Sequence, residues 1–334
     1  MGLLTYKDTK MQSQTVYKQF GESKWIPFAK ENAKLPRKDA NELKGCGLGK
    51  FLVSCALGES LEEKVDIIKK HRNKVDVLTC DKGFGALLEC GVKADYVMIC
   101  DTNVEFKHVK DYISETKDVK LICTPYANIE WTSSWKGDRY FYVNKDSIET
   151  ELVFQEILGN VRMIPAGSNV SNAMVVFFMG VDEKSRYNWS AYEMTYLVGY
   201  DYSWRPKGNY YSWANPVPKR YYMSHRTLLD INKDWCFTSE NLFFSAKWLT
   251  QYATSFDIPI MNCSGRGLLQ IKRMGDLEEE LSRIVNNKYV RDSVKRSYDL
   301  LCDARTNYEK AKQNFTKTRE GLIQWPLETK LELA

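Results

Sequence analysis

The chain has 334 residues, of which 43% are hydrophobic and 27% charged, and its formal net charge is +5. This composition is typical of a globular protein long enough for one large domain or two smaller ones. The basic residues are spread along the chain rather than gathered in blocks, so the composition favours no nucleic-acid partner. No apolar run approaches the roughly 18 residues of a membrane span, and the first residues lack the apolar core of a signal peptide.

The cysteines indicate a reducing environment. There are nine, an odd number, and no two form a C-x-x-C pair. Four of them stand at the ends of predicted strands: Cys55, Cys80, Cys100 and Cys123. This pattern predicts reduced, buried thiols in a cytoplasmic protein, and neither a disulfide framework nor a zinc site.

The first part of the chain alternates apolar runs with helical patterns. Residues 1–45 are polar and weakly periodic, and we interpret them as an N-terminal extension that packs on the domain surface. Strands are then predicted at 51–56, 75–80, 95–100 and 119–126, with helices at 61–72 and 82–91. Short apolar runs alternating with helices of about ten residues are typical of a parallel sheet covered on both faces. The fold class predicted is therefore α/β and Rossmann-like.

The second part continues this alternation and ends in a helical extension. A looser aromatic stretch at 131–143 precedes a predicted helix at 165–180 and a strand at 192–201. An irregular, aromatic-rich segment at 202–235 leads to a helix at 239–256 and a strand at 258–265. We predict one domain over 46–275 and a helical segment over 276–334. An apolar stripe in that segment recurs every three or four residues: Val294, Tyr298, Leu301, Ala304, Tyr308, Ala311 and Phe315. It predicts packing on the domain or, alternatively, a homo-oligomer.

Residues that follow the predicted strands are the candidates for a binding site, because ligands of open parallel sheets bind beyond the carboxyl ends of the strands. These candidates are Ser54, Gly58, Ser60, Asp81, Asp101, Gly167, Ser168, Asn169 and Asp201. The turns SCALGES (54–60) and GSNVSN (167–172) both place backbone N–H groups at a helix start, which favours a phosphate. Neither has the spacing of a G-x-G-x-x-G loop or a P-loop, and the first is equally a capping box.

Asp81 and Asp101 each end a strand, where a carboxylate can hold a magnesium ion or the hydroxyls of a ribose. Capping of the next helix is the alternative use of each. Asn103 stands where a second carboxylate of a D-x-D pair would be. The sequence therefore predicts that no metal is required, with magnesium at these two aspartates as the alternative.

Histidine is rare, and one histidine is a candidate general base. His71 and His108 stand among charged residues, which predicts solvated side chains. His225 lies in RYYMSHR, in the irregular segment. Because the pKa of imidazole lies near neutrality, His225 is a candidate base, and a structural histidine is the alternative.

The ordered set of motifs resembles the MptE-like domain of archaeal 6-hydroxymethylpterin pyrophosphokinases and of the Maf proteins that glycosylate flagellin. The residues that carry the resemblance are FLVSCALGESLEEKVDIIKK, VDVLTCDKGFGALLECGVKADYVMICD, PAGSNVSNAMVVFFMG and LVGYD, and it covers residues 45–282. SCALGESL keeps Ser60 and Leu61 of the family's G-x-G-P-S-L turn and lacks its first glycines and proline. The resemblance implies a nucleotide site in a Rossmann-like domain.

A more distant resemblance is to metal-independent bacterial sialyltransferases that use CMP-sugars. It rests on Gly199 and Asp201 in LVGYDYSW, Tyr211 in KGNYYSW and His225 in YYMSHR. It implies that His225 deprotonates the acceptor hydroxyl and that Tyr211 stabilises the departing nucleotide phosphate. It also implies that the nucleotide is lined by Ser60, Asp81, Asp101 and Gly167–Asn169.

Three functions follow as hypotheses. The first is a glycosyltransferase with a nucleotide-sugar donor, no required cofactor, and a glycan, a protein or a modified nucleic-acid base as acceptor. The second is a magnesium-dependent pyrophosphokinase that acts on a pterin-like alcohol. The third is a non-catalytic nucleotide-binding or assembly protein, since a fold does not by itself imply a function.

Overall fold

The computed structural model describes two units of the chain. The described residues are 21–145, 148–159, 161–165, 169–181, 188–206, 208, 211–213 and 225–284, and near the end of the chain 300, 303–304, 307–308 and 310–313. The first unit spans Met1–Asn286 and the second Asn287–Ala334. In the second unit the described residues are helical, and the side chains of Leu300 and Tyr308 are exposed.

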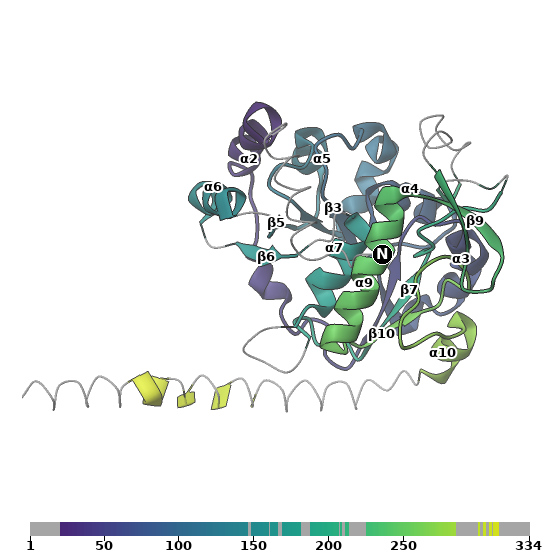
Figure 1. Ribbon diagram of the computed structural model, residues 1–334. Helices are drawn as coiled ribbons and strands as arrows, with labels where there is room; N and C mark the ends of the chain where they lie inside the picture. Colours follow the sequence, from purple (N-terminus) through teal and green to yellow (C-terminus); the bar gives the residue numbers. More distant parts are fainter. Residues whose placement is uncertain are drawn as a thin grey trace, which may run out of the picture. The chain divides into compact units, whose positions relative to one another are not determined.

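A parallel sheet forms the centre of the first unit (Figure 1). Its strands are β1 (Phe51–Cys55), β2 (Val75–Cys80), β3 (Tyr96–Ile99), β4 (Lys120–Cys123), β5 (Arg139–Asn144), β6 (Arg162–Ile164), β7 (Met194–Val198) and β10 (Ile260–Asn262). They lie in the order β10-β7-β1-β2-β3-β4-β5-β6, and the neighbouring pairs are parallel. The predicted α/β, Rossmann-like fold is confirmed. The strands are apolar on both faces because helices cover both faces.

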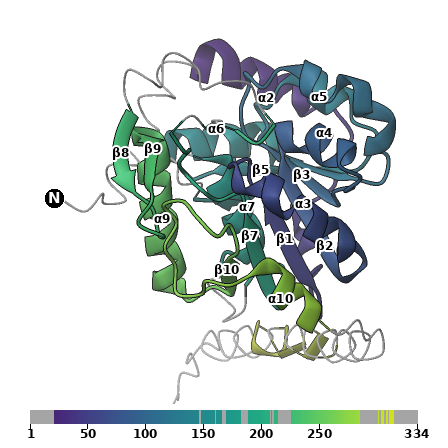
Figure 2. The ribbon, with the colours of Figure 1, turned by 90° about the vertical axis from the view of Figure 1, so that its right-hand side faces the viewer.

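Helices lie on the two faces of this sheet (Figures 1 and 2). Helices α3 (Ser60–Lys70) and α4 (Asp81–Glu89) lie on one face, and α7 (Val170–Met179) and α9 (Glu240–Phe256) lie on the other. This division follows from right-handed crossovers, because the chain moves outward from β1 to β6 and then returns through α7 to the other side of β1. From Asn172 to Met179, helix α7 is buried, as its uniformly apolar sequence requires.

The described part of the N-terminal extension packs on the β4 side of the sheet. It forms η1 (Gly21–Trp25), α2 (Ile26–Asn32) and η2 (Ala40–Leu43). The buried Asn32 amide donates to the carbonyl oxygens of Pro125, at 2.7 Å, and Ala127, at 2.9 Å. Its own oxygen accepts a hydrogen bond from Thr132 in α5 (Ile129–Ser134). These bonds replace the hydrogen bonds to water that the amide loses when it is buried.

Several elements were not predicted. The aromatic stretch at 131–143 contains most of α5 and all of β5 except Asn144, and α6 (Ile148–Leu158) and β6 follow it. Between β3 and β4 lie η4 (Phe106–His108) and η5 (Lys110–Thr116), and η3 (Arg72–Lys74) follows α3. The prediction that 202–235 is irregular is wrong from His225 onward. There β8 (His225–Leu229) pairs antiparallel with β9 (Trp235–Ser239) in a hairpin.

Helix α10 (Leu277–Arg283) lies within the first unit, although the predicted C-terminal segment begins at 276. Glu278 pairs with Lys70, at 2.6 Å, and with His71, at 3.1 Å, at the end of α3. The side chain of His71 is buried at this contact, so the prediction that it is solvated is wrong. These contacts hold the start of the predicted helical extension against the sheet-covering helix. The later residues of the stripe that the structure describes, Ala304, Tyr308 and Ala311, belong to the second unit.

Within the described ranges, no helix combines the length and the apolar character needed to cross a membrane. The cysteines there are free thiols, and those of β1, β2 and β4 are buried: Cys55, Cys80 and Cys123. Burial raises the pKa of the Cys55 thiol to about 12. A thiol of this kind behaves as a small apolar side chain rather than as a nucleophile.

Candidate functional site

The predicted site residues gather at the carboxyl edge of the sheet. The strand order reverses between the neighbouring strands β1 and β7. From β1 the chain continues to β2 on one side, whereas β7 is followed by β10 on the other side. Such a reversal is where ligands of open α/β sheets bind. Gly58 and Ser60 follow β1, and Asp201 follows β7, so the fold places all three at this point.

Ser60 and Asp201 are bound to each other. The amide nitrogen of Ser60 donates to Oδ2 of Asp201 at 2.8 Å, and the Ser60 hydroxyl donates to Oδ1. Gly58 lies so close that a Cβ at its position would be 2.6 Å from Cγ of Asp201. Asp201 is 1% exposed. The amide and hydroxyl of Ser60, which were predicted to bind a nucleotide, are therefore satisfied by a carboxylate of the chain itself.

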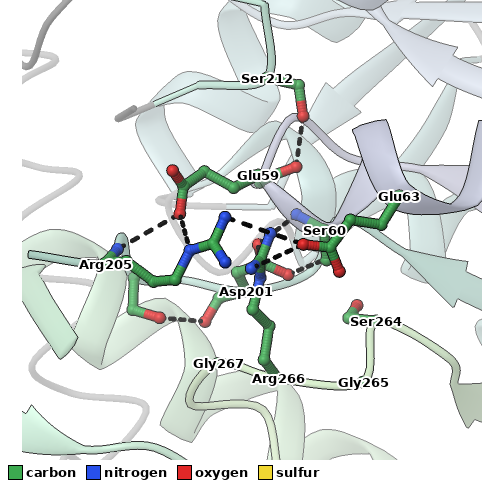
Figure 3. Close-up of polar contacts among 12 residues, drawn as sticks. Glu59, Ser60, Glu63, Asp201, Arg205, Ser212, Ser264, Gly265, Arg266 and Gly267 are labelled. Carbon is green, nitrogen blue, oxygen red and sulfur yellow. Dashed lines mark hydrogen bonds and ion pairs between the residues drawn. The ribbon is translucent and has the colours of Figure 1, made fainter. Parts of the chain in front are cut away.

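Burial is the strongest influence on the carboxyl group of Asp201. Burial raises its pKa to about 6, above the ordinary value of 3.8, while the Ser60 hydrogen bonds and the charge of Arg266 act in the opposite direction. Nε of Arg266 lies 3.7 Å from Oδ2 of Asp201, and its Nη1 lies 3.0 Å from Oε1 of Glu63 (Figure 3). Asp201 is thus a buried carboxylate that is stabilised by donors and one nearby cation.

A second ion pair closes the other side of the same turn (Figure 3). Nε of Arg205 lies 3.3 Å from Oε2 of the buried Glu59. The Ser212 hydroxyl donates to the carbonyl of Gly58, and the Ser212 amide donates to the carbonyl of Leu57 at 2.8 Å. The charged residues Glu59, Glu63, Arg205 and Arg266 were not predicted as site residues. The small-residue turn SGRG at 264–267, which follows β10, is the signal that points to Arg266.

Ser54 and Asn169 take part in a separate set of contacts around α7. The buried Ser54 hydroxyl lies 2.7 Å from the hydroxyl of Tyr200, which donates to the Ser171 carbonyl at 3.2 Å. Asn169 caps α7, since its side chain accepts from the Ser171 amide at 2.8 Å. Ser54 therefore connects β1 to the start of α7 through a tyrosine. Gly167 and Ser168 lie outside the described residues.

Asp81 and Asp101 end adjacent strands. Asp81 is 8% exposed and begins α4, and its Oδ1 accepts from the Lys82 amide at 2.6 Å. Burial raises the pKa of Asp81 to about 6, the charge of Asp101 adds to this rise, and Lys82 opposes it. Asp101 is exposed and accepts from the Asn103 amide at 2.9 Å. Each aspartate thus closes a local turn. Within the described ranges, no cluster of three or more acidic, histidine or cysteine side chains is placed to hold a metal ion.

A chain of aromatic contacts links Trp204, Tyr211, Phe237 and His225, which are called here the Trp204 cluster. Tyr211 and Phe237 pack against Trp204. The ring of His225 lies 4.6 Å from that of Phe237 between centroids. Trp204 and Phe237 also exchange backbone hydrogen bonds of 2.8 and 2.9 Å, which fix the hairpin to the segment after β7. The predicted base and the predicted phosphate-stabilising tyrosine are therefore connected indirectly, through Phe237 and Trp204.

The Trp204 cluster continues to the end of β2 through Lys82. Nζ of Lys82 lies 4.8 Å from the centre of the Tyr211 ring, a distance typical of a cation–π contact. Because Lys82 and Asp81 directly follow β2, this contact connects the end of β2 with the tyrosine. The carboxyl edge thus carries two regions: the Ser60–Asp201 region, which is internally paired, and the Lys82–Tyr211–His225 region.

The reversed strand order and the polar edge define a Rossmann-like α/β protein whose candidate site lies at the carboxyl ends of its strands. Residues 27–183 match the family model described as 6-hydroxymethylpterin diphosphokinase MptE-like. The chain therefore carries an MptE-like segment, and the resemblance predicted from the motifs is confirmed there.

A solved structure shares this fold. The structure of MAf glycosyltransferase from Magnetospirillum magneticum AMB-1 matches with a TM-score of 0.54 and 13% sequence identity. The match covers 82% of this chain and 41% of that chain, so this protein spans less than half the length of that glycosyltransferase. At this identity the likeness concerns the fold alone. No curated protein sequence matches the chain.

Proposed function

We propose that this protein is a nucleotide-dependent transferase, and specifically a glycosyltransferase that moves a sugar from a nucleotide-sugar donor to an acceptor hydroxyl. The observation that carries the proposal is the continuity of the Lys82–Tyr211–His225 region. It offers a cation and a phenol where a phosphate could bind, and an imidazole in the same aromatic cluster. The MAf glycosyltransferase, which has the same fold, supports the choice of reaction.

In this proposal His225 is the general base. It accepts the proton of the acceptor hydroxyl while that oxygen attacks the anomeric carbon of the donor sugar. The bond between the anomeric carbon and the phosphate oxygen breaks, and the nucleotide leaves with the bonding electrons. Tyr211 donates a hydrogen bond to the departing phosphate, where negative charge develops. No metal is needed for these steps.

An exposed aromatic side chain next to this region supports a sugar ligand. Trp213 is 39% exposed, and its amide donates to Oε1 of Glu62 at 2.5 Å. Its backbone has a φ of +53°, which a bulky residue rarely adopts. The contacts of Ser212 and Glu62 hold this conformation beside Tyr211. An indole face at this position could stack on a sugar ring.

A second function has its own support. Asp81 and Asp101 come from neighbouring strands and are close enough for the charge of Asp101 to raise the pKa of Asp81. Magnesium bound to nucleotide phosphates often uses only one or two protein carboxylates. Together with the diphosphokinase family model, this pair supports a magnesium-dependent pyrophosphokinase as the alternative.

A thermal-shift panel tests the proposal. Nucleotides and nucleotide sugars of cytidine, uridine, guanosine and adenosine are each added with magnesium and with EDTA, and the melting temperature is measured. A ligand that binds only the native state raises the melting temperature by mass action. Stabilisation by a nucleotide sugar that persists in EDTA is expected. Stabilisation by ATP that requires magnesium would favour the pyrophosphokinase instead.

A further inference from the structure

Lys82 is a cation at the carboxyl edge of the sheet, just after the end of β2. It is the second residue of α4 and is half-buried. Its ammonium contacts the ring of Tyr211 at 4.8 Å. Among the residues that the structure describes, no carboxylate lies within ion-pairing distance of its ammonium. A half-buried charge without a counter-ion favours the binding of an anion, because solvent screens it only in part.

Unlike Lys82, the two arginines at the same edge form ion pairs with carboxylates of the described residues. Arg205 is paired with Glu59 and Arg266 with Glu63, at 3.3 and 3.0 Å. The start of α3 is likewise satisfied by Asp201. Although the buried Nε and Nη2 atoms of Arg266 make no hydrogen bond among the described residues, an incoming phosphate would compete in the Ser60–Asp201 region with carboxylates that are already in place. At Lys82 it would displace none.

The acidic groups near Lys82 are held in contacts of their own. Asp81 accepts from the Lys82 amide, and Glu105 pairs with Lys107. Burial and the charges of Lys82 and Lys107 lower the pKa of His108, so that its imidazole adds little positive charge near neutral pH. The ammonium of Lys82 is thus the cation that these neighbours leave available for a ligand.

We infer that Lys82 and Tyr211 form a phosphate-binding pair, in which the ammonium and the phenol hold the phosphate of the nucleotide. This inference rests on the proposed function and assigns the phosphate position within it. The aromatic ring orients the lysine, and the lysine offsets the charge that develops on the departing phosphate. Lys82 then acts on the nucleotide directly, and His225 acts on the acceptor.

Isothermal titration calorimetry with UDP, GDP, CDP and ADP, and with the corresponding nucleosides, tests the pair. The variants are Lys82→Met, which keeps the apolar stem, Lys82→Arg, which keeps the charge, and Lys107→Met as the matched control, because Lys107 is already paired with Glu105. We expect Lys82→Met to weaken binding of the preferred diphosphate by about tenfold and to leave binding of its nucleoside unchanged. Lys82→Arg should retain most of the affinity, and Lys107→Met all of it.

The outcomes separate the inference from the proposed function. A wild-type protein that binds none of the nucleotides overturns the proposed function and the phosphate-binding pair together. If wild type and Lys82→Met bind a diphosphate with the same affinity, only the phosphate-binding pair is overturned. If Lys82→Met fails to fold, Lys82→Gln takes its place. Wild-type affinity for the diphosphate that does not fall with added salt would also contradict the pair.

Discussion

The carboxylate of Asp201 accepts hydrogen bonds from the amide and the hydroxyl of Ser60, which lies 141 positions earlier in the chain. These bonds join the carboxyl end of β7 to the first turn of α3, across the point where the strand order reverses. An anion at a helix N-terminus is favoured by the unpaired N–H groups and the helix dipole. In this protein the anion is a side chain. The reversal point is therefore stabilised internally, and the Lys82–Tyr211 pair is the more accessible position for a phosphate.

Replacement of Asp201 by asparagine should change how stability depends on pH. The folded state raises the pKa of Asp201 from 3.8 to about 6, so the folded protein binds a proton more tightly than the unfolded chain. Stability contributed by this group is therefore greatest below pH 4 and is lost as the pH rises to about 6. The full change corresponds to about 3 kcal/mol. Denaturant unfolding of wild type and Asp201→Asn at several pH values between 4 and 8 measures it.

Asp118 provides the matched control, since it is an aspartate with a side chain 79% exposed. We expect the free energy of unfolding of Asp118→Asn to follow the wild-type curve. In Asp201→Asn the free energy of unfolding should fall less between pH 4 and 6 than it does in wild type. Identical pH curves for wild type and Asp201→Asn would mean that burial does not disfavour the charged carboxylate.

Substitutions of the hydrogen-bonded residues Ser54 and Tyr200 should have non-additive effects on the free energy of unfolding. Tyr200→Phe removes the partner of the Ser54 hydroxyl, which is 0% exposed and lies 2.7 Å away. An unsatisfied buried hydroxyl costs about 1–3 kcal/mol. The double variant Ser54→Ala/Tyr200→Phe should be destabilised by less than the sum of the two single variants. Urea unfolding of the four proteins tests this, and strict additivity would contradict a direct hydrogen bond.

Metal removal should leave ligand binding unchanged in the proposed glycosyltransferase. The melting temperature of the nucleotide-bound protein is expected to be equal in magnesium and in EDTA. Asp101→Asn should leave the ligand-induced shift unchanged, because Asp101 holds the Asn103 amide in an exposed turn. A shift that requires magnesium and disappears in Asp101→Asn would instead assign Asp81 and Asp101 to a metal.

Much of the fold could be predicted because β1 to β4 are short apolar runs separated by helices. Val75–Cys80 was predicted without error, since the run is bounded by polar residues on both sides. The hairpin β8–β9 was not predicted. Its strand β8 is largely exposed, so it lacks the alternation of apolar and polar residues that indicates a half-buried strand. Trp235, which is exposed at the start of β9, weakens the pattern further.

That Ser60 and Asp201 lie at the same edge of the sheet could also be predicted, but their hydrogen bonds to each other could not. The carboxyl ends of parallel strands lie at one edge, so Ser60 and Asp201 were expected to be near each other. Sequence gives no measure of side-chain direction, and both residues were assigned to a nucleotide rather than to each other. Glu59 and Arg205 were missed for the same reason, since their ion pair joins segments with no shared motif. Lys82 was not predicted as a site residue, although it directly follows the predicted residue Asp81.

The measurement that tests the account most directly is the rate at which nucleotide is released from the nucleotide sugar that stabilises the protein, with acceptor present, in wild type and His225→Ala. We predict that His225→Ala loses about a hundredfold or more in turnover, as expected for loss of a general base, while its affinity for the nucleotide stays the same. His71→Gln serves as the control, because His71 contacts Glu278 on α10. Unchanged turnover in a folded His225→Ala protein would remove His225 from the mechanism and contradict the proposed glycosyl transfer at this cluster.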